Sequence, residues 1–419
     1  KFCALLAAIF PLVSGGYFHA YDARPYGLVL GFGTLALLCW QSATLNRFRQ
    51  LSIVCLALSL AAALSTHYYG IFIIFPLALG ETVRTLMRRR LDVPIWAAFG
   101  LAMTPLVWHL PLIKQAQAYS GAFWAPPAWV DIPGFYSYLI EPMVPALTAI
   151  LILAGIYIMV FSDDARAQDQ AAPFSPPVHE IAAAFGFIAI PIICVILAKL
   201  ATGAFTNRYA LPAVIGFSVL VAFIAAKIWN DHALMAMALA VCLGGWFLLT
   251  TAREIRDPSS NSLSSFTEVA LQNSIKLLQS ERERSLPLVA ADAHTFTILS
   301  HYAPPEITSR IVYLADPEIA LKRLRHNSVE RGMIDLIKPW FHMNVTDYKS
   351  FIAEHPRFLV YGNFGALGFV NWILPELQAN NMRVEFRGRN GDNLFFLVSR
   401  NEQSANVDSN RGSESSPTQ

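Results

Sequence analysis

The stretch YGLVLGFGTLALLCWQSATL, residues 26–45, decides the fold because it runs for 20 residues without a charge. A helix of about 20 mostly apolar residues spans the hydrocarbon core of a bilayer. Arg24 stands just before this stretch, and Arg47 and Arg49 stand just after it. The pattern therefore predicts a membrane-spanning helix with basic residues near both of its ends.

Eight further apolar stretches have the same character, which makes nine candidate spans in all. Several are short, as expected for tilted helices or for helices that stop early to line a cavity. The eight lie at about 2–16, 50–66, 69–83, 93–113, 144–161, 181–199, 210–228 and 232–251.

Charge divides the chain into two parts. The 419 residues include 31 basic and 29 acidic ones, but only 23 of these charged residues lie in 1–250. A soluble domain is about 25% charged, so the first part is typical of a membrane bundle and the remaining 169 residues are typical of a soluble domain. This division excludes a single soluble globule, a fibrous protein and a disordered protein. A net charge of +2 gives no support for a nucleic-acid partner.

The basic residues also predict the orientation of the bundle, because cytoplasmic loops carry an excess of Lys and Arg. Nine basic residues fall on one side of the predicted spans: Lys1, Arg47, Arg49, Arg84, Arg88, Arg89, Arg90, Arg166 and Lys227. Four fall on the other side: Arg24, Lys114, Lys199 and Arg208. The side with four is therefore predicted to be periplasmic or lumenal, together with the loop 114–143 and everything after about 252.

The C-terminal part reads as a small α/β domain. Apolar runs at 286–291, 310–315 and 357–362 predict strands, 295–303 and 372–381 predict helices, and 382–388 with 393–400 predict a closing hairpin around Asn390-Gly391. Strands that alternate with helices predict a three-layer, Rossmann-like arrangement. No GxGxxG follows the first strand, which disfavours a nucleotide site. The expected domains are 1–252, 253–400 and a disordered tail, 401–419.

Three short polar clusters fall on the predicted outer side of the membrane, where such groups invite a functional hypothesis. Asp22 and Arg24 form either a site or a local ion pair that caps the next helix. His67, followed by Tyr68, belongs either to a site or to an aromatic belt. Arg208 acts either as a phosphate ligand or as an anchor. The loop 114–143, which includes Trp124, adds aromatic side chains that could stack on sugars or lie among lipid headgroups.

These clusters resemble a known family. Asp22-Ala23-Arg24-Pro25-Tyr26 is similar to the acidic-Ala-Arg-x-Tyr signature of the polytopic glycosyltransferases of family 39, the ArnT-like and protein-mannosyltransferase-like enzymes of the GT-C fold. The stretch 65–70, with His67, resembles the family's His at the next outer turn. Arg208-Tyr209-Ala210-Leu211-Pro212 resembles its Arg-Tyr-x-x-Pro. The resemblance covers about residues 1–250.

The resemblance implies an inverting transfer of a sugar from a polyprenyl-phosphate donor to an acceptor hydroxyl on a glycan, lipid or protein. It implies that Asp22 is a secondary acidic residue supported by Arg24, that His67 lines the cavity, and that Arg208 with Tyr209 binds the donor phosphate. We expect Tyr26, Tyr68 and Trp124 to line the substrate cavity. The family's main catalytic Asp would precede Lys1, so we expect the chain to be an N-terminally truncated fragment that lacks it. No cofactor is assigned with certainty, although a carboxylate-rich outer site could hold a divalent cation whose ligands are unknown.

The sequence thus predicts an α-helical polytopic membrane protein with a GT-C-like bundle, followed by an extracytoplasmic α/β domain, in the plasma or inner membrane. Two other functions stay open. A transporter or flippase of lipid-linked sugars predicts charged residues near the middle of the bilayer and repeat symmetry. A non-catalytic assembly protein predicts an outer face without a cavity.

Overall fold

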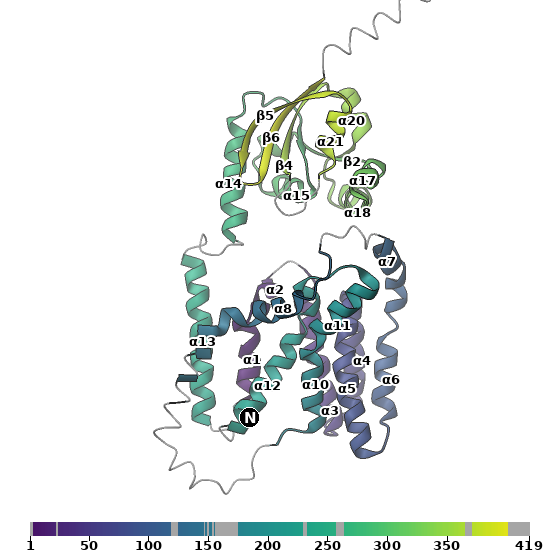
Figure 1. The fold of residues 1–419 in the computed structure, drawn as a ribbon, viewed down its shortest axis with the longest axis vertical. Coiled ribbons are helices and arrows are strands. Elements are labelled where there is room, and N and C mark those ends of the chain that lie inside the picture. Colours follow the sequence, from purple (N-terminus) through teal and green to yellow (C-terminus); the bar gives the residue numbers. More distant parts are fainter. Residues whose placement is uncertain are drawn as a thin grey trace, which may run out of the picture. The chain divides into compact units, whose positions relative to one another are not determined.

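The computed structural model describes residues 3–21, 24–118, 125–145, 147–148, 151–152, 155, 175–228, 233–256, 264–364 and 371–400. The chain divides into two compact units, Lys1–Ala252 and Arg253–Gln419. The first is helical and the second contains the sheet (Figure 1).

The first unit is a bundle of apolar helices. Its longer helices are α1 (Ala4–Val13), α3 (Tyr26–Thr44), α4 (Arg49–Thr66), α5 (Ile71–Arg88), α6 (Val93–Ala102), α7 (Leu106–Ala118), α8 (Asp131–Ile140), α10 (Val178–Ile188), α11 (Ile190–Leu197), α12 (Ala213–Ile228) and α13 (Ala233–Arg256). Short turns join them: η1 (Gly15–Tyr17), α2 (Phe18–Tyr21), η2 (Tyr68–Gly70), η4 (Glu141–Met143), η5 (Ala198–Thr202) and η6 (Asn207–Ala210).

Four of the described helices are long and apolar enough to cross a membrane: Tyr26–Thr44, Arg49–Thr66, Tyr68–Arg88 and Val93–Pro111. The pair Val178–Ile188 and Ile190–Leu200, bent by 45°, would make a fifth if it counts as one span. Three more predicted spans correspond to shorter apolar helices, Ala4–Val13, Ala213–Lys227 and Met237–Arg253. The predicted span 144–161 lies mostly outside the described residues. The apolar helices support an integral membrane protein.

The predicted outer loop 114–143 contains a helix that packs into the bundle. Residues 131–140 form helix α8, and its Phe135 and Leu139 are completely buried in the core of the bundle. Tyr136 donates a hydrogen bond from its hydroxyl to the carbonyl of Ile188, 2.8 Å away.

Buried charges tie α3, α4 and α5 together near the cytoplasmic end predicted from the basic loops. Arg84 donates to Glu81 at 2.7 Å and to Asp92 at 3.0 Å, while Arg49 donates to the other oxygen of Asp92 at 2.6 Å. The indole of Trp40 donates to Glu81 at 3.0 Å. Because α5 continues to Arg88, Glu81 lies two turns inside the helix and is completely buried.

Close helix contacts set the packing of the bundle around α10. A side chain at Gly216 of α12 would collide with the carbonyl of Ala184 on α10, and one at Gly80 of α5 would meet the carbonyl of His179, 2.8 Å away. The helices can therefore approach closely at these glycines, as small residues allow in membrane bundles. This packing fixes the start of α12, which carries part of the site described below.

The second unit is a six-stranded mixed sheet in the order β3-β2-β1-β4-β6-β5. Its strands are β1 (Leu288–Ala290), β2 (Ile311–Ala315), β3 (Val345–Asp347), β4 (Arg357–Asn363), β5 (Met382–Asn390) and β6 (Asn393–Arg400). The first four are parallel, while β6 pairs antiparallel with both β4 and β5. The five predicted strands and the hairpin at Asn390-Gly391 are confirmed, and β3 was missed because it has only three residues.

Helices pack on both faces of this sheet, because successive residues of its inner strands point to opposite sides. One apolar core lies around Leu288 and Ala290, and the other lies around Val289. The helices are α14 (Ser264–Ser280), α15 (Ala293–Tyr302), α16 (Pro305–Thr308), α17 (Pro317–Leu324), α18 (Ser328–Gly332), η8 (Met333–Ile337), α19 (Lys338–Phe341), α20 (Tyr348–Glu354) and α21 (Ile373–Ala379). Asp292 caps α15 by accepting a hydrogen bond from the amide of Thr295.

Candidate functional site

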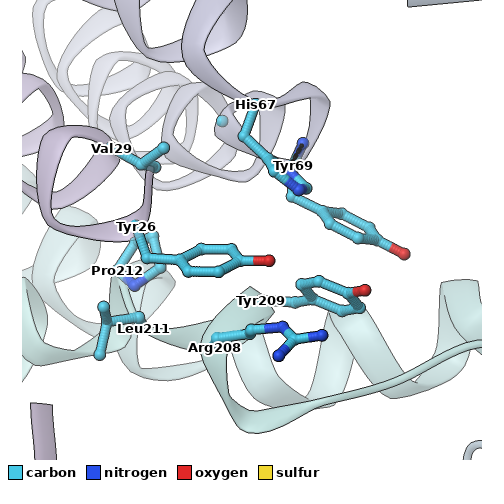
Figure 2. Close-up of a pocket in the computed structure, with 9 residues that line it drawn as sticks. Tyr26, Val29, His67, Tyr69, Arg208, Tyr209, Leu211 and Pro212 are labelled. Carbon is cyan, nitrogen blue, oxygen red and sulfur yellow. Dashed lines mark hydrogen bonds between the residues drawn. The ribbon is translucent and has the colours of Figure 1, made fainter. Parts of the chain in front are cut away.

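Three segments far apart in the sequence meet at one end of the bundle. They are the start of α3 at Tyr26, the turn η2 with the preceding His67, and the turn η6 that leads through Pro212 into α12. They form a narrow cleft lined by Tyr26, Val29, His67, Tyr69, Gly70, Arg208, Tyr209, Leu211 and Pro212 (Figure 2). The free space among these side chains is small, about 10 Å³, which is room for roughly one water molecule.

Local backbone chemistry positions each segment. Pro25 precedes α3, where the fixed φ of proline suits a helix start. His67 is extended and uses its own ring to cap the next turn, because its Nδ1 accepts a hydrogen bond from the amide of Tyr69 at 3.2 Å. Thr206 is likewise extended before η6 begins. Each extended residue directly precedes a short turn, η2 or η6, whose side chains line the cleft.

Aromatic rings form a connected stack along the cleft. The ring centres of Tyr69 and Tyr209 are 4.2 Å apart, and those of Tyr26 and His67 are 5.3 Å apart. His67 also stacks on Tyr69 at 5.4 Å with nearly parallel planes. Contacts of this kind stabilise the rings against one another.

Arg208 places a guanidinium group between two of these rings. It lies 5.6 Å from the ring centre of Tyr26 and 5.6 Å from that of Tyr209. The side chain is half-buried, and in Figure 2 it extends in the same direction as the three tyrosines. Of the residues that line the described cleft, Arg208 alone carries a full charge at neutral pH, because the imidazole of His67 is neutral there. The cleft is therefore suited to an anion.

The ring of His67 is a neutral hydrogen-bonding group. Burial, and then the repulsion from His109 and Arg208, lowers the pKa of His67 from 6.5 to about 4. Because Nδ1 accepts the Tyr69 amide, the proton of the neutral ring stays on Nε2. His67 thus contributes an N–H donor rather than a second cation.

The structure brings together four of the residues selected from the sequence: Tyr26, His67, Arg208 and Tyr209. Tyr68 stacks on His67 at 4.6 Å but does not line the cleft. Arg24 is exposed and does not line it either. Asp22 and Trp124 lie outside the described residues.

Two residues of this region were not among those predicted from the sequence to form the site. Tyr69 is 7% exposed and completes the ring stack. His19 is 8% exposed, lies 5.9 Å from the Tyr26 ring, and shares a 3.3 Å hydrogen bond with the hydroxyl of Tyr138 on α8. The signal for Tyr69 was its place beside His67, and the signal for His19 was its place three residues before Asp22.

The described part of the chain contains no group of side chains arranged to bind a metal ion. There, no three His, Cys, Asp or Glu side chains gather in a way that could hold a metal ion. The ligands of the divalent cation considered from the sequence stay unassigned, and Asp22 lies outside the described residues.

Comparison with known proteins gives one structural match. No family model matches the chain, and no curated protein matches it. The chain is similar to the solved structure of ArnT from Cupriavidus metallidurans bound to undecaprenyl phosphate, with a TM-score of 0.46 and 13% sequence identity. The similarity covers 94% of this chain and 77% of that one.

Proposed function

We propose that this chain belongs to a membrane glycosyltransferase that moves a sugar from a polyprenyl-phosphate donor to an acceptor hydroxyl, with inversion. The observation that carries the proposal is the position of Arg208 between the rings of Tyr26 and Tyr209, in a cleft at one end of a membrane bundle. A guanidinium binds phosphate oxygens with paired N–H donors, and aromatic rings suit both a sugar face and an isoprenoid chain.

Each residue of the cleft then has a chemical task. The acceptor oxygen attacks the anomeric carbon, the bond from that carbon to the phosphate oxygen breaks, and the phosphate leaves with the bonding electrons. Arg208 stabilises the negative charge that develops on the departing phosphate, and His67 donates an N–H to the same region. A carboxylate base takes the proton from the acceptor hydroxyl.

Asp22 and Arg24 keep a supporting role in this proposal. Both lie within four residues of Tyr26 in the sequence, and Tyr26 lines the cleft. Asp22 would orient the acceptor, and Arg24 would support Asp22. The principal base would be a further carboxylate of the protein, since Asp22 corresponds to a secondary acidic position.

The proposal places the cleft on the extracytoplasmic side. Arg49, Arg84 and the loop with Arg88, Arg89 and Arg90 belong to the opposite ends of α4 and α5 from His67. Because basic loops face the cytoplasm, the cleft and the second unit would face the periplasm or exterior. The donor phosphate would then meet Arg208 at the outer leaflet.

A transfer assay tests the proposal. The full-length protein in nanodiscs is given a panel of radiolabelled polyprenyl-phosphate sugars with lipid and glycan acceptors, and release of the sugar from the lipid is measured. We expect Arg208→Ala to lose about 100-fold or more in turnover, and Asp22→Asn to lose turnover as well. Lys199→Ala is the matched control, because Lys199 is a cation on the same predicted side that packs over Trp129 at 5.1 Å, outside the cleft.

Each alternative predicts a different result. A transporter of lipid-linked sugars would move the lipid across proteoliposomes without breaking its bond to the sugar, and an assembly protein would do neither. Unchanged turnover in both Arg208→Ala and Asp22→Asn would overturn the site assignment.

A further inference from the structure

The second unit contains a helical segment with more apolar side chains than the core of the unit buries. Three consecutive elements, α18, η8 and α19, make it a nearly continuous helix over residues 328–341. Met333 is buried in the core and Ile337 packs against that core. Five further apolar side chains on either flank are exposed: Val329 by 42%, Ile334 by 37%, Leu336 by 59%, Trp340 by 76% and Phe341 by 65%.

The spacing of these residues is that of an amphipathic helix. Val329, Leu336 and Trp340 follow one another at seven and four residues, and Ile334 and Phe341 are seven apart, so each set lies along one flank. The polar residues Arg331, Asp335, Lys338 and His342 are spaced by four, three and four, and all are exposed. A helix with a polar stripe and an apolar surface containing Trp, Phe and Leu is typical of segments that lie in a membrane interface.

Exposed apolar side chains are concentrated in this one segment of the second unit. The other large apolar side chains that are exposed in the described part of this unit are separated along the chain, at Ile255, Val269, Tyr302, Leu321 and Phe386. Single exposed apolar residues are normal on a protein surface, whereas a contiguous group marks an interaction surface. An indole beside a phenyl ring, with Lys338 and Arg331 on the polar stripe, fits the headgroup layer of a bilayer that contains anionic lipid.

The covalent structure keeps a bilayer within reach of this segment. Helix α13 is apolar and ends at Arg256, and α14 begins at Ser264, so only seven residues join them. Seven residues extend at most about 25 Å. A domain tethered so closely to a membrane meets lipid at a high effective concentration, which favours a weak interfacial contact over a partner from solution.

We propose that residues 329–341 form an interfacial membrane anchor of the second unit, with Trp340 and Phe341 inserted at the boundary between headgroups and acyl chains. Arg331 and Lys338 lie along the anionic headgroups. The anchor holds the α/β unit against the bilayer surface independently of the chemistry in the cleft, so this proposal does not rest on the proposed function.

A probe attached in the full chain tests the anchor. Trp340→Cys is labelled with a polarity-sensitive fluorophore in nanodiscs of phosphatidylcholine and phosphatidylglycerol. The matched control is Phe386→Cys, because Phe386 is also an exposed apolar residue (55%) but lies far from the proposed anchor. Phe386 belongs to β5 at one edge of the sheet, whereas η8 packs against β3 at the opposite edge. The five native cysteines all lie in the first unit, and the labelled wild-type chain supplies the blank.

We expect the probe at 340 to show blue-shifted emission, quenching by nitroxide-bearing lipids, and little quenching by aqueous iodide, while the probe at 386 shows the reverse. Adding Arg331→Glu and Lys338→Glu should weaken the lipid quenching at 340 in anionic nanodiscs. If iodide quenches both probes equally, the anchor does not exist. If the probe at 340 is shielded from both quenchers, protein rather than lipid covers the segment, and the proposal is likewise overturned.

Discussion

The guanidinium carbon of Arg208 lies 5.6 Å from the ring centre of Tyr26, although the two residues belong to opposite ends of the first unit's sequence. Tyr209 flanks the same group at the same distance. The two rings hold the cation in place and remove part of its water. A partly desolvated, oriented cation attracts an anion more strongly than an exposed one does.

The shape of the Arg208 side chain should matter as well as its charge. Arg208→Lys keeps the charge but loses the planar fork and its stacking on the rings, so we expect an intermediate loss of turnover, about tenfold, against about 100-fold or more for Arg208→Ala. The measurement is kcat/KM for the lipid-linked sugar. Equal activity of the wild type and Arg208→Lys would mean that only the charge is needed.

The ring of Tyr26 should support Arg208 mainly through its face, although its hydroxyl also contacts the guanidinium group. Tyr26→Phe keeps the face and should stay within about threefold of the wild type, whereas Tyr26→Leu removes a contact worth about 0.5–2 kcal/mol, or up to about 30-fold in donor KM. The two variants differ little in size, so they are compared directly. Equal losses in Tyr26→Phe and Tyr26→Leu would assign the role to the hydroxyl, because both variants lack it and only Tyr26→Phe keeps the ring.

The lowered pKa of His67 makes a prediction about acid stability. An unfolded chain binds a proton at this His below its ordinary pKa of 6.5, but the folded protein resists protonation until about pH 4. The contribution of His67 to the free energy of unfolding is therefore complete above pH 6.5 and is lost as the pH falls from 6.5 toward 4. We expect the melting temperature of the wild type to fall more between pH 7 and pH 5 than that of His67→Gln. Parallel curves for the two proteins would show that His67 titrates normally.

The buried ion cluster should control stability rather than catalysis. Glu81 accepts from both Arg84 and Trp40, so Glu81→Gln leaves the buried Arg84 with one acid, Asp92. We expect a loss of about 3 kcal/mol, seen as a lower melting temperature in detergent, with unchanged kcat per folded molecule. Glu141→Gln is the control, because Glu141 is exposed on η4 and its removal should change neither quantity. A catalytic defect in Glu81→Gln at full stability would contradict this structural role.

Much of the site could be predicted because its residues follow local rules. The sorting of basic residues by membrane side placed the segments at Tyr26, His67 and Arg208 on one side, and the structure brings them into one cleft. The pairing of Arg49 with Asp92 and of Gln41 with Glu180 could not be predicted, because such pairs join residues that are 43 and 139 positions apart. The sequence pattern shows which residues are polar, but not which distant partner satisfies each one.

In the second unit, too, features that depend on neighbouring residues were predicted, and features that depend on distant partners were not. Strands β4, β5 and β6 have seven to nine residues and were predicted from their apolar patterns. Strand β3 has only three residues and owes its place to pairing with β2, so no local pattern indicated it. The buried Glu330, which accepts from the indole of Trp372 at 2.8 Å, was likewise hidden in a charged stretch of sequence.

Direct binding of a polyprenyl phosphate tests the central claim, that Arg208 in this cleft holds a lipid-linked phosphate. Native mass spectrometry or a fluorescent-lipid titration would compare the wild type, Arg208→Ala and Lys199→Ala in the same detergent. We predict that Arg208→Ala raises the Kd of the phosphate-bearing lipid at least about tenfold, as expected when a charge-assisted hydrogen bond of about 1.5–3 kcal/mol is lost. Lys199→Ala should bind as the wild type does, and the uncharged polyprenol should bind all three proteins equally. Equal affinity of the wild type and Arg208→Ala for the phosphate lipid would contradict the account.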